Sequence, residues 1–357
     1  MALKRRNNAL PSTSIDTFFA CTIILAVALI ATAFLCSTMQ TSINSTQDIN
    51  KDSYLQAIAD HIITNPGAPV NWGTSSSVPA DFGLAAGSST IPYELDIDKI
   101  TRLSNLNNYS LSYADMGNAA KLNNIALGIT VSQVMSINIE QTSHTPIDNN
   151  VSFTFAILTS IDSEPTSASL NCYVVANNYL INVTDSTSGV GVGSVTVQIP
   201  SAETGNALLI VFARASFDDR ITSYAIYNFL NSTQESAPND DILTLTPLNY
   251  TLSYTNSSDV TIQNGYIFSY TYRQNLTLVQ STTQCPIPRI IDQSPFVIVL
   301  CGFLNNGTYF QEWASYPQVP LKAGSSFEDS EQNVFSYIVT INGVLYTVDV
   351  SFGDVIS

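Results

Sequence analysis

Apolar positions are most concentrated near the start of the chain, in Ile15–Met39, which reads IDTFFACTIILAVALIATAFLCSTM. From Phe18 onward this segment runs for more than twenty residues without a charge. A helix of about 20 apolar residues is long enough to cross a hydrocarbon core of ~30 Å. Three basic residues, KRR at 4–6, precede the segment, and the next basic residue is Lys51. This bias predicts a single span with the N-terminus in the cytoplasm and the C-terminus outside.

Two other interpretations compete with an anchor for this segment. A basic region, an apolar run and an A-x-A motif at 31–33 are also typical of a cleaved secretory signal. The run continues past this motif without a helix breaker, however, which favours a retained anchor. A lipoprotein acylated at Cys36 is set aside, because the bulky Leu35 stands where a small residue is expected.

The helix is expected to continue beyond the membrane. Residues 40–64 contain neither Pro nor Gly, and Leu55, Ile58 and Ile62 recur at helical spacing. The sequence Asn-Pro-Gly at 65–67 then stops the helix. The pattern therefore predicts a cytoplasmic leader at 1–14 and one helix over 15–65, apolar at first and amphipathic later.

A small α/β neck is predicted over residues 66–145. Its first part is rich in Pro, Gly and Ser, and we expect Trp72 and Phe82 to pin this loop. Short helices are expected at 96–105 and 112–122, followed by an alternating strand at 125–140.

The rest of the chain alternates apolar strand-length runs with polar turns, which is typical of β-sandwiches. We expect one sandwich at 146–234, an acidic loop at 235–241 and a second sandwich at 242–357, both immunoglobulin-like. The pair Asn342-Gly343 predicts a two-residue hairpin. The turn DSTSG at 185–189 resembles one in carboxypeptidase-regulatory-like modules. The fold class is therefore α+β: a long N-terminal helix, a neck and two sandwiches.

The excess of acidic residues limits the possible partners of the chain. After residue 40 there remain nine of the 12 Lys and Arg, against 27 of the 28 Asp and Glu. Such an excess of negative charge argues against nucleic acid as a partner. Nine N-x-[S/T] motifs, all after the apolar segment, predict glycosylation of an exported chain. They begin at Asn44, Asn108, Asn150, Asn182, Asn231, Asn249, Asn256, Asn275 and Asn306.

Three cysteines lie outside the apolar segment, so they cannot all pair with one another. Cys285 and Cys301 flank an apolar run that could return beside its neighbour, and we expect a disulfide between them. Cys172 is then a buried thiol.

Motifs for catalysis are scarce, and no catalytic residue, metal ligand or cofactor is assigned. The only histidines, His61 and His144, do not form a metal-binding motif. Three carboxylate pairs could supply oxygen ligands to calcium, but solvated side chains are the simpler interpretation. For one of them, Asp218-Asp219-Arg220, we expect a turn with a local ion pair. Trp313 and the nearby tyrosines could form a sugar platform or serve as strand residues. The carboxylate pairs are Asp96 and Asp98, Asp218 and Asp219, and Asp240 and Asp241.

The N-terminal residues, a basic patch followed by STSIDTFF and an apolar helix, resemble archaeal type IV pilin-like proteins. In that family an acidic residue lies a few positions into the mature helix, and Asp16 is at the matching position. The resemblance implies a role for Asp16 in assembly with other pilin-like subunits. The Pro11-Ser12 junction departs from the family's processing site. The segment after the helix, with NPGAPVNWG at 65–73 and YELDIDKI at 93–100, resembles the same family.

Three functions are therefore considered. The first is a non-enzymatic, membrane-anchored archaeal surface protein, with a pilin-like structural or adhesive role. The alternative is a membrane-tethered extracellular binding protein for a carbohydrate or peptide, and the third is a secreted enzyme. Filament co-purification, ligand-dependent thermal shift and turnover would distinguish them.

Overall fold

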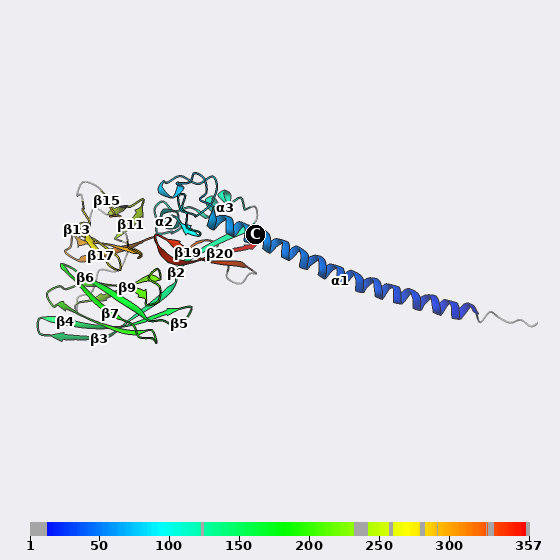
Figure 1. Cartoon of the computed structure of the whole chain (residues 1–357), viewed down its shortest axis with the longest axis horizontal. Coiled ribbons are helices and arrows are strands. Elements are labelled where there is room, and N and C mark those ends of the chain that lie inside the picture. The colour runs from blue at the N-terminus through cyan, green and yellow to red at the C-terminus, as the bar shows by residue number, and fades with distance from the viewer. Residues whose placement is uncertain are drawn as a thin grey trace, which may run out of the picture. The chain divides into compact units, whose positions relative to one another are not determined.

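The computed structural model describes residues 13–122, 125–231, 242–256, 260–278, 283–290, 292–325, 327 and 332–354. The chain separates into two compact units, residues 1–57 and 58–357. Figure 1 shows the long helix α1 and the labelled strands of the second unit. The described part is rich in strands, as the α+β fold class predicts.

Helix α1 is continuous over Thr13–Thr64. It ends where the sequence predicts, because the Asn65 side chain accepts a hydrogen bond from the Gly67 N–H at 2.7 Å. Gly67 has a φ of +74°, which glycine adopts without strain. Within the described residues, no helix combines the length and the apolarity that a membrane crossing requires. The side chain of Asp16 lies outside the described ones.

The neck contains η1 (Trp72–Thr74), β1 (Glu94–Leu95), α2 (Ile97–Thr101) and α3 (Tyr113–Ala119). The two predicted helices are confirmed in shorter form, each capped by a polar side chain. Asp96 accepts hydrogen bonds from the N–H groups of Asp98 and Lys99, and Ser112 caps α3 in the same way. Trp72 packs against Phe82 with ring centroids 5.9 Å apart, as expected for the loop.

Buried cations hold the irregular part of the neck together. The Lys99 ammonium donates to the carbonyls of Pro66 at 2.8 Å and Ala85 at 2.7 Å. Arg102 donates in the same way to the carbonyls of Trp72 and Ser77. Burial lowers the pKa of both side chains. Each cation therefore satisfies loop carbonyls that would otherwise be buried without donors.

The neck sheet corrects the predicted domain boundaries. Its strand order is β1-β19-β20-β2-β18. The last hairpin, with Asn342 and Gly343 at positive φ in its turn, therefore completes the neck and does not belong to the second sandwich. These strands, apart from β1, are β2 (Ile125–Gln133), β18 (Leu321–Gly324), β19 (Asn333–Ile341) and β20 (Val344–Asp354).

The first sandwich begins earlier than predicted. The expected strand at 125–140 is two strands divided at Val134, and the second of them pairs with β4. The outer sheet contains β3 (Met135–Ile147), β4 (Asn150–Ile161), β5 (Glu164–Pro165) and β8 (Val192–Pro200). The inner sheet has the order β10-β9-β6-β7 and contains β6 (Ala168–Ala176), β7 (Tyr179–Ser186), β9 (Asn206–Ala215) and β10 (Thr222–Leu230).

The second sandwich is shorter than predicted, ending with β17. Its inner sheet has the order β14-β13-β16-β17 and contains β13 (Val260–Phe268), β14 (Arg273–Asn275), β16 (Phe296–Leu304) and β17 (Tyr309–Tyr316). Its outer sheet contains β11 (Leu243–Leu248), β12 (Thr251–Asn256) and β15 (Gln284–Pro286).

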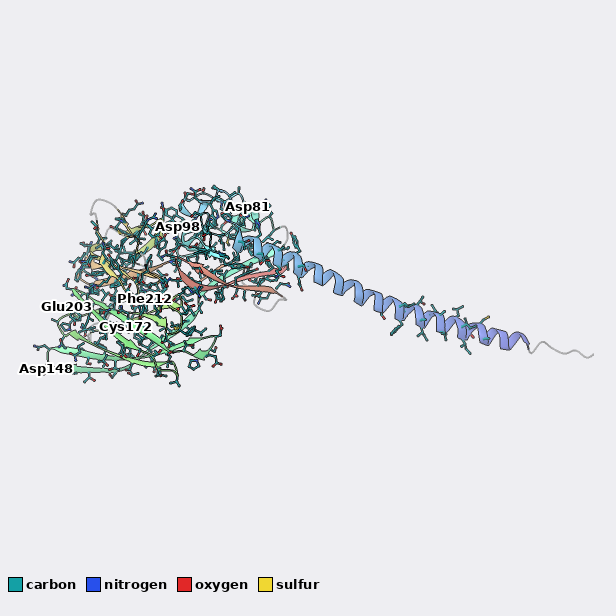
Figure 2. All side chains as sticks on the ribbon, in the orientation of Figure 1. Asp81, Asp98, Asp148, Cys172, Glu203 and Phe212 are labelled. Carbon is teal, nitrogen blue, oxygen red and sulfur yellow. The ribbon has the colours of Figure 1, made fainter. Side chains whose placement is uncertain are left out.

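The two inner sheets pack on each other, so the sandwiches form a stack of four sheets. Tyr173 and Phe212 of the first sandwich share a buried cluster with Phe268 and Val299 of the second. Cys172 lies on the opposite face of its sheet, in the core of the first sandwich (labelled with Phe212 in Figure 2). Strands β9 and β16 are therefore buried on both faces, which explains why they read as continuous apolar runs without alternation.

Candidate functional site

A cavity with a volume of about 370 Å³ lies beside β17, the end strand of its sheet. Strands β10 and β11 and two loops, at 105–108 and 318–320, complete the wall. The lining residues are Asn105, Leu106, Asn108, Tyr224, Leu243, Thr244, Leu245, Glu312, Trp313, Ala314, Ser315, Gln318, Val319 and Pro320. Both apolar and polar side chains therefore face a space at the low end of the ~300–1,000 Å³ typical of ligand pockets.

Trp313 is the largest side chain of this wall. The chain has two tryptophans, and they differ sharply: Trp72 is fully buried, whereas Trp313 is 39% exposed. The ring of Trp313 contacts Tyr224 in a T-shaped arrangement with centroids 6.4 Å apart. Among the described residues, no hydrogen bond is formed by its indole N–H. An exposed indole with an unused donor is a suitable contact surface for a ligand.

Buried hydrogen bonds hold the two loops that line the cavity. The Asn107 amide donates to the Gln318 side-chain oxygen at 3.0 Å and to the Pro247 carbonyl at 3.1 Å. The Gln318 amide in turn donates to the Leu245 carbonyl at 3.4 Å. Because both side chains are nearly fully buried, the loops on either side of the cavity are held in place.

Two further lining residues are positioned in the same way. The Tyr224 hydroxyl donates to the Val319 carbonyl, and burial raises the pKa of this hydroxyl, so Tyr224 is neutral at ordinary pH. The Glu312 carboxylate accepts a hydrogen bond from the Ile242 N–H at 3.2 Å. Trp313 and Glu312 are neighbours on β17 and lie on opposite faces of the strand. The cavity therefore reaches around the open edge of the sheet.

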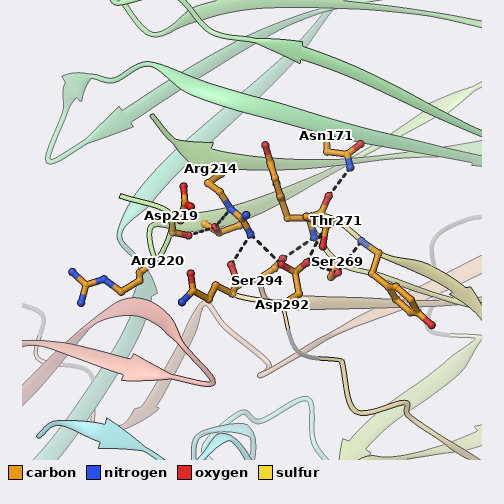
Figure 3. A network of polar contacts seen from close by, with 12 residues as sticks. Asn171, Arg214, Asp219, Arg220, Ser269, Thr271, Asp292 and Ser294 are labelled. Atoms are coloured by element: carbon orange, nitrogen blue, oxygen red, sulfur yellow. Dashed lines mark hydrogen bonds and ion pairs between the residues drawn. The ribbon is translucent and has the colours of Figure 1, made fainter. Parts of the chain in front are cut away.

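A second group of polar residues joins the two inner sheets (Figure 3). Arg214 of β9 forms an ion pair with Asp292 at 3.1 Å, and the side chains are 15% and 6% exposed. The guanidinium also lies over the Tyr270 ring at 4.0 Å. The Asn171 amide, from β6, donates to the Tyr270 carbonyl. We refer to these four residues and Ser269 as the inter-sandwich clasp.

Asp292 is held as a carboxylate by the clasp. One oxygen accepts from the Ser269 hydroxyl at 2.7 Å and from the Thr271 N–H at 2.9 Å, and the other accepts from Arg214. Burial raises the pKa of Asp292, but these hydrogen bonds outweigh it, and the net pKa is lowered. The donors around Asp292 and the guanidinium of Arg214 thus bind acceptors of the protein itself, which supports a structural role for the clasp.

The predicted disulfide between Cys285 and Cys301 is wrong, because both cysteines are free and buried in the structure. Cys285 pairs with Leu252 in the core between the two sheets of the second sandwich. Cys301 lies in the cluster between the two sandwiches, on the other face of β16 from Leu300. Neighbouring residues of a strand point to opposite faces, so one sheet separates the two sulfurs. Cys172 is a buried thiol, as expected.

Asn231 is poorly placed for the predicted glycosylation. This residue is 2% exposed, and its amide nitrogen donates to the carbonyls of Pro200 and Glu203. A glycan cannot be attached there without breaking both bonds and opening the core. The remaining motifs stay predictions, and the side chains of Asn44 and Asn256 lie outside the described ones. Exposed motif asparagines are Asn108, Asn182, Asn249, Asn275 and Asn306.

Two of the three carboxylate pairs lie in the described part of the chain. In the described part of the chain, no group of three or more potential ligands gathers. Asp98 accepts hydrogen bonds from the Tyr316 hydroxyl at 2.6 Å and the Asn249 N–H at 2.7 Å, and its pKa is raised by burial. Asp218 pairs with Arg220 at 2.8 Å, which confirms the predicted turn. The pair at 240–241 lies outside the described residues.

The two histidines have different surroundings. His61 lies 3.6 Å from the Asp81 carboxylate, near the end of α1. His144 stacks on Phe153 with ring centroids 4.9 Å apart. Neither residue lines the cavity beside β17.

Comparisons with known proteins do not identify a family. No protein-family model and no curated protein matches the chain. Among solved structures, HBP35 of Porphyromonas gingivalis aligns at 13% identity over 51% of this chain and 63% of its own, with a TM-score of 0.20. Human GIVD cytosolic phospholipase A2 aligns at 10% identity over 64% and 32%, with a TM-score of 0.14. Scores this low carry no argument about fold or function.

Proposed function

We propose that the chain is a non-enzymatic surface protein, anchored in a membrane by the apolar part of α1, with a pilin-like structural or adhesive role. The observation that carries this proposal is the exposure of apolar side chains along α1. Between Ile23 and Leu35, the large apolar residues are 58–70% exposed. Three consecutive ones, Ile23, Ile24 and Leu25, point in different directions around the helix. A helix that is apolar on all sides needs a non-aqueous surrounding.

Lipid and neighbouring copies of the same helix are the two surroundings that fit. The sequence around these residues extends the apolar run from Phe18 to Met39, which is long enough for a bilayer. The acidic residues that follow, and the sandwiches of the immunoglobulin-like kind expected from the strand pattern, suit an exterior domain. Such domains would act as spacers or adhesive modules.

Alkaline carbonate washing of membranes tests the anchor. The wild-type chain is expected to stay in the pellet. The variant Leu29→Arg places a charge in the middle of the run, at a cost of about 2.5–3.5 kcal/mol, and is expected to shift the protein toward the supernatant. Leu29→Ala is the matched control. Quantitative release of the wild-type chain would rule the anchor out.

Substitution of Asp16 tests the proposed pilin-like assembly role separately from the anchor. In a filament, this carboxylate would pair with the amine of a neighbouring subunit, provided that the leader is removed. Without removal, Asp16 is expected only to cap the helix, where the helix dipole favours a negative charge. Asp16→Ala should abolish filament incorporation in the first case and leave the exterior folded in both. Unchanged incorporation, or absence of the wild-type chain from any filament, argues against an assembly role.

A membrane-tethered binding protein is the second candidate function, favoured by the cavity beside β17. Its exposed tryptophan and its few polar lining residues are typical of a small-molecule site. A ligand-dependent thermal shift of the full-length chain in detergent tests it, since a ligand that binds only the folded state raises the unfolding temperature.

A further inference from the structure

We propose that the cavity beside β17 binds a neutral saccharide unit, with Trp313 as its aromatic contact. This inference deepens the second candidate function and is independent of the membrane anchor. It rests on three properties of the cavity: an apolar contact surface, hydrogen-bonding groups without partners, and the absence of cations.

The apolar contact surface consists of Trp313 and Leu106. Both side chains are exposed, although they line a concave site, and they come from different parts of the chain. A sugar ring has one face of C–H groups, which packs on an aromatic ring, and a rim of hydroxyls. The buried Tyr224 contacts the Trp313 ring edge to face, which limits the freedom of the indole before a ligand binds.

The hydrogen-bonding groups come from the loop at 105–108. Asn105 and Asn108 are exposed, and within the described residues neither amide has a partner. Each amide offers a donor and an acceptor, which matches the dual character of a hydroxyl. The indole N–H of Trp313 adds a donor. This set can bind several hydroxyls of one ring.

The charge of the wall restricts the ligand to neutral saccharides. Among the lining residues Glu312 is the only charged one, and neither lysine nor arginine contributes to the wall. A phosphate, sulfate or uronate would therefore approach a carboxylate without a compensating cation. The net charge of the chain, −16, opposes anionic ligands as well.

The saccharide has two possible sources. It can be a free or cell-surface glycan, or it can be a glycan attached to the chain itself. Asn108 begins the motif Asn-Tyr-Ser and lines the cavity, so a glycan at this position would start at its mouth. Ser110→Ala abolishes the motif while leaving the Asn108 amide in place, and it separates the two sources.

Acrylamide quenching of tryptophan fluorescence tests the proposal on the full-length chain in detergent. Trp72 is buried, so the quenchable signal comes from Trp313. We expect neutral gluco-, manno- or galacto-oligosaccharides, up to millimolar concentration, to protect Trp313, and an oligogalacturonate to have no effect. Calorimetric titration with the protecting sugar should show binding at least about tenfold weaker for Trp313→Ala. Phe217→Ala, which removes an exposed aromatic residue that does not line the cavity, is the control and should bind unchanged.

The outcomes decide between the alternatives. Protection of Trp313 in the glycosylated wild type before any addition, lost in Ser110→Ala, supports the saccharide and assigns it to the chain's own glycan. Protection by an added sugar in both forms supports an external source. Protection by a peptide library and not by sugars overturns the ligand class. Equal binding by oligogalacturonate overturns the restriction to neutral rings, and no protection by any probe overturns both the inference and the binding function.

Discussion

Replacing Asp292 by asparagine should weaken the contact between the two sandwiches. The carboxylate is the acceptor of the inter-sandwich clasp: it binds Arg214 through one oxygen and Ser269 and Thr271 through the other. Asparagine keeps the shape but has only one acceptor oxygen. Whichever way the amide is turned, its NH₂ group faces a donor, and the Arg214 charge loses its counterion.

The size of the effect follows from burial. Removing one partner of a buried ion pair costs about 3–5 kcal/mol, because the other charge is left uncompensated. Arg214 retains a hydrogen bond to the Gln293 carbonyl at 3.0 Å and its position over Tyr270, which offsets part of this cost. We therefore expect Asp292→Asn to lower the free energy of unfolding by about 2–4 kcal/mol.

The pH dependence has a defined sign. Because the pKa of Asp292 is lowered in the folded state, the carboxylate stabilises the fold above its unfolded pKa of about 3.9. This stabilisation is lost as the pH falls through the folded pKa, because the wild-type side chain then becomes uncharged, as the asparagine of the variant is at every pH. The difference in unfolding free energy between wild type and variant should therefore be constant near neutral pH and shrink below about pH 4.

Urea denaturation at several pH values measures these quantities. Asp148→Asn is the control, because Asp148 is exposed in the β3–β4 turn with a φ of 54°, a conformation that asparagine adopts readily. Its effect should stay within about 0.5 kcal/mol. The double variant Arg214→Met/Asp292→Asn should cost less than the sum of the single ones. An Asp292→Asn effect equal to the control, or one independent of pH, would refute the role assigned to the clasp.

Three further predictions follow from buried polar groups. Burial raises the pKa of Cys285 and Cys301 to about 11, so both should resist thiol reagents in the native chain and react after denaturation without reductant. Lys99→Met leaves two buried carbonyls without a donor, so it should lower the free energy of unfolding by at least about 2 kcal/mol in urea titrations. The control Lys121→Met, at an exposed site, should leave this free energy nearly unchanged. Glycopeptide mapping should find Asn231 unmodified.

Local features of the fold are well predicted from the sequence. The end of α1 follows from Asn-Pro-Gly at 65–67, whose geometry depends only on neighbouring residues. The β19–β20 turn follows from Asn342 and Gly343, which adopt positive φ readily. The caps of α2 and α3 follow from Asp96 and Ser112. In each case, a few consecutive residues contain all the information needed.

Long-range pairing could not be predicted in the same way. The sequences of β19 and β20 do not indicate that β20 pairs with β2, which lies more than two hundred positions earlier. Many alternating strands have compatible faces, so the pattern alone does not select the partner. The Cys285–Cys301 prediction failed for a related reason. An apolar run between two cysteines does not reveal that β16 is buried on both faces, with Cys301 on the face away from Cys285.

The residues of the candidate site could be predicted only in part from the sequence. Trp313 could be chosen as a contact residue, because an aromatic side chain among strand residues is a recognisable signal. Asn105 and Asn108 gave no comparable signal, apart from the glycosylation motif, since amides are common in surface loops. Only the fold brings this loop of the neck to the open edge of β17, more than two hundred positions away.

The topology also determines where a force applied through the end of α1 would be carried. The Asp60 carboxylate accepts a hydrogen bond from the Tyr337 hydroxyl of β19 at 2.8 Å, and the Ile62 carbonyl accepts one from the Leu84 N–H at 2.8 Å. The end of the helix is thus tied to the neck sheet, whose strands β2 and β20 are more than two hundred positions apart in the sequence. The two sandwiches lie between these strands in the sequence, as one long insertion. Tension applied through the end of α1 would therefore reach the neck sheet before it reaches the stack of four sheets.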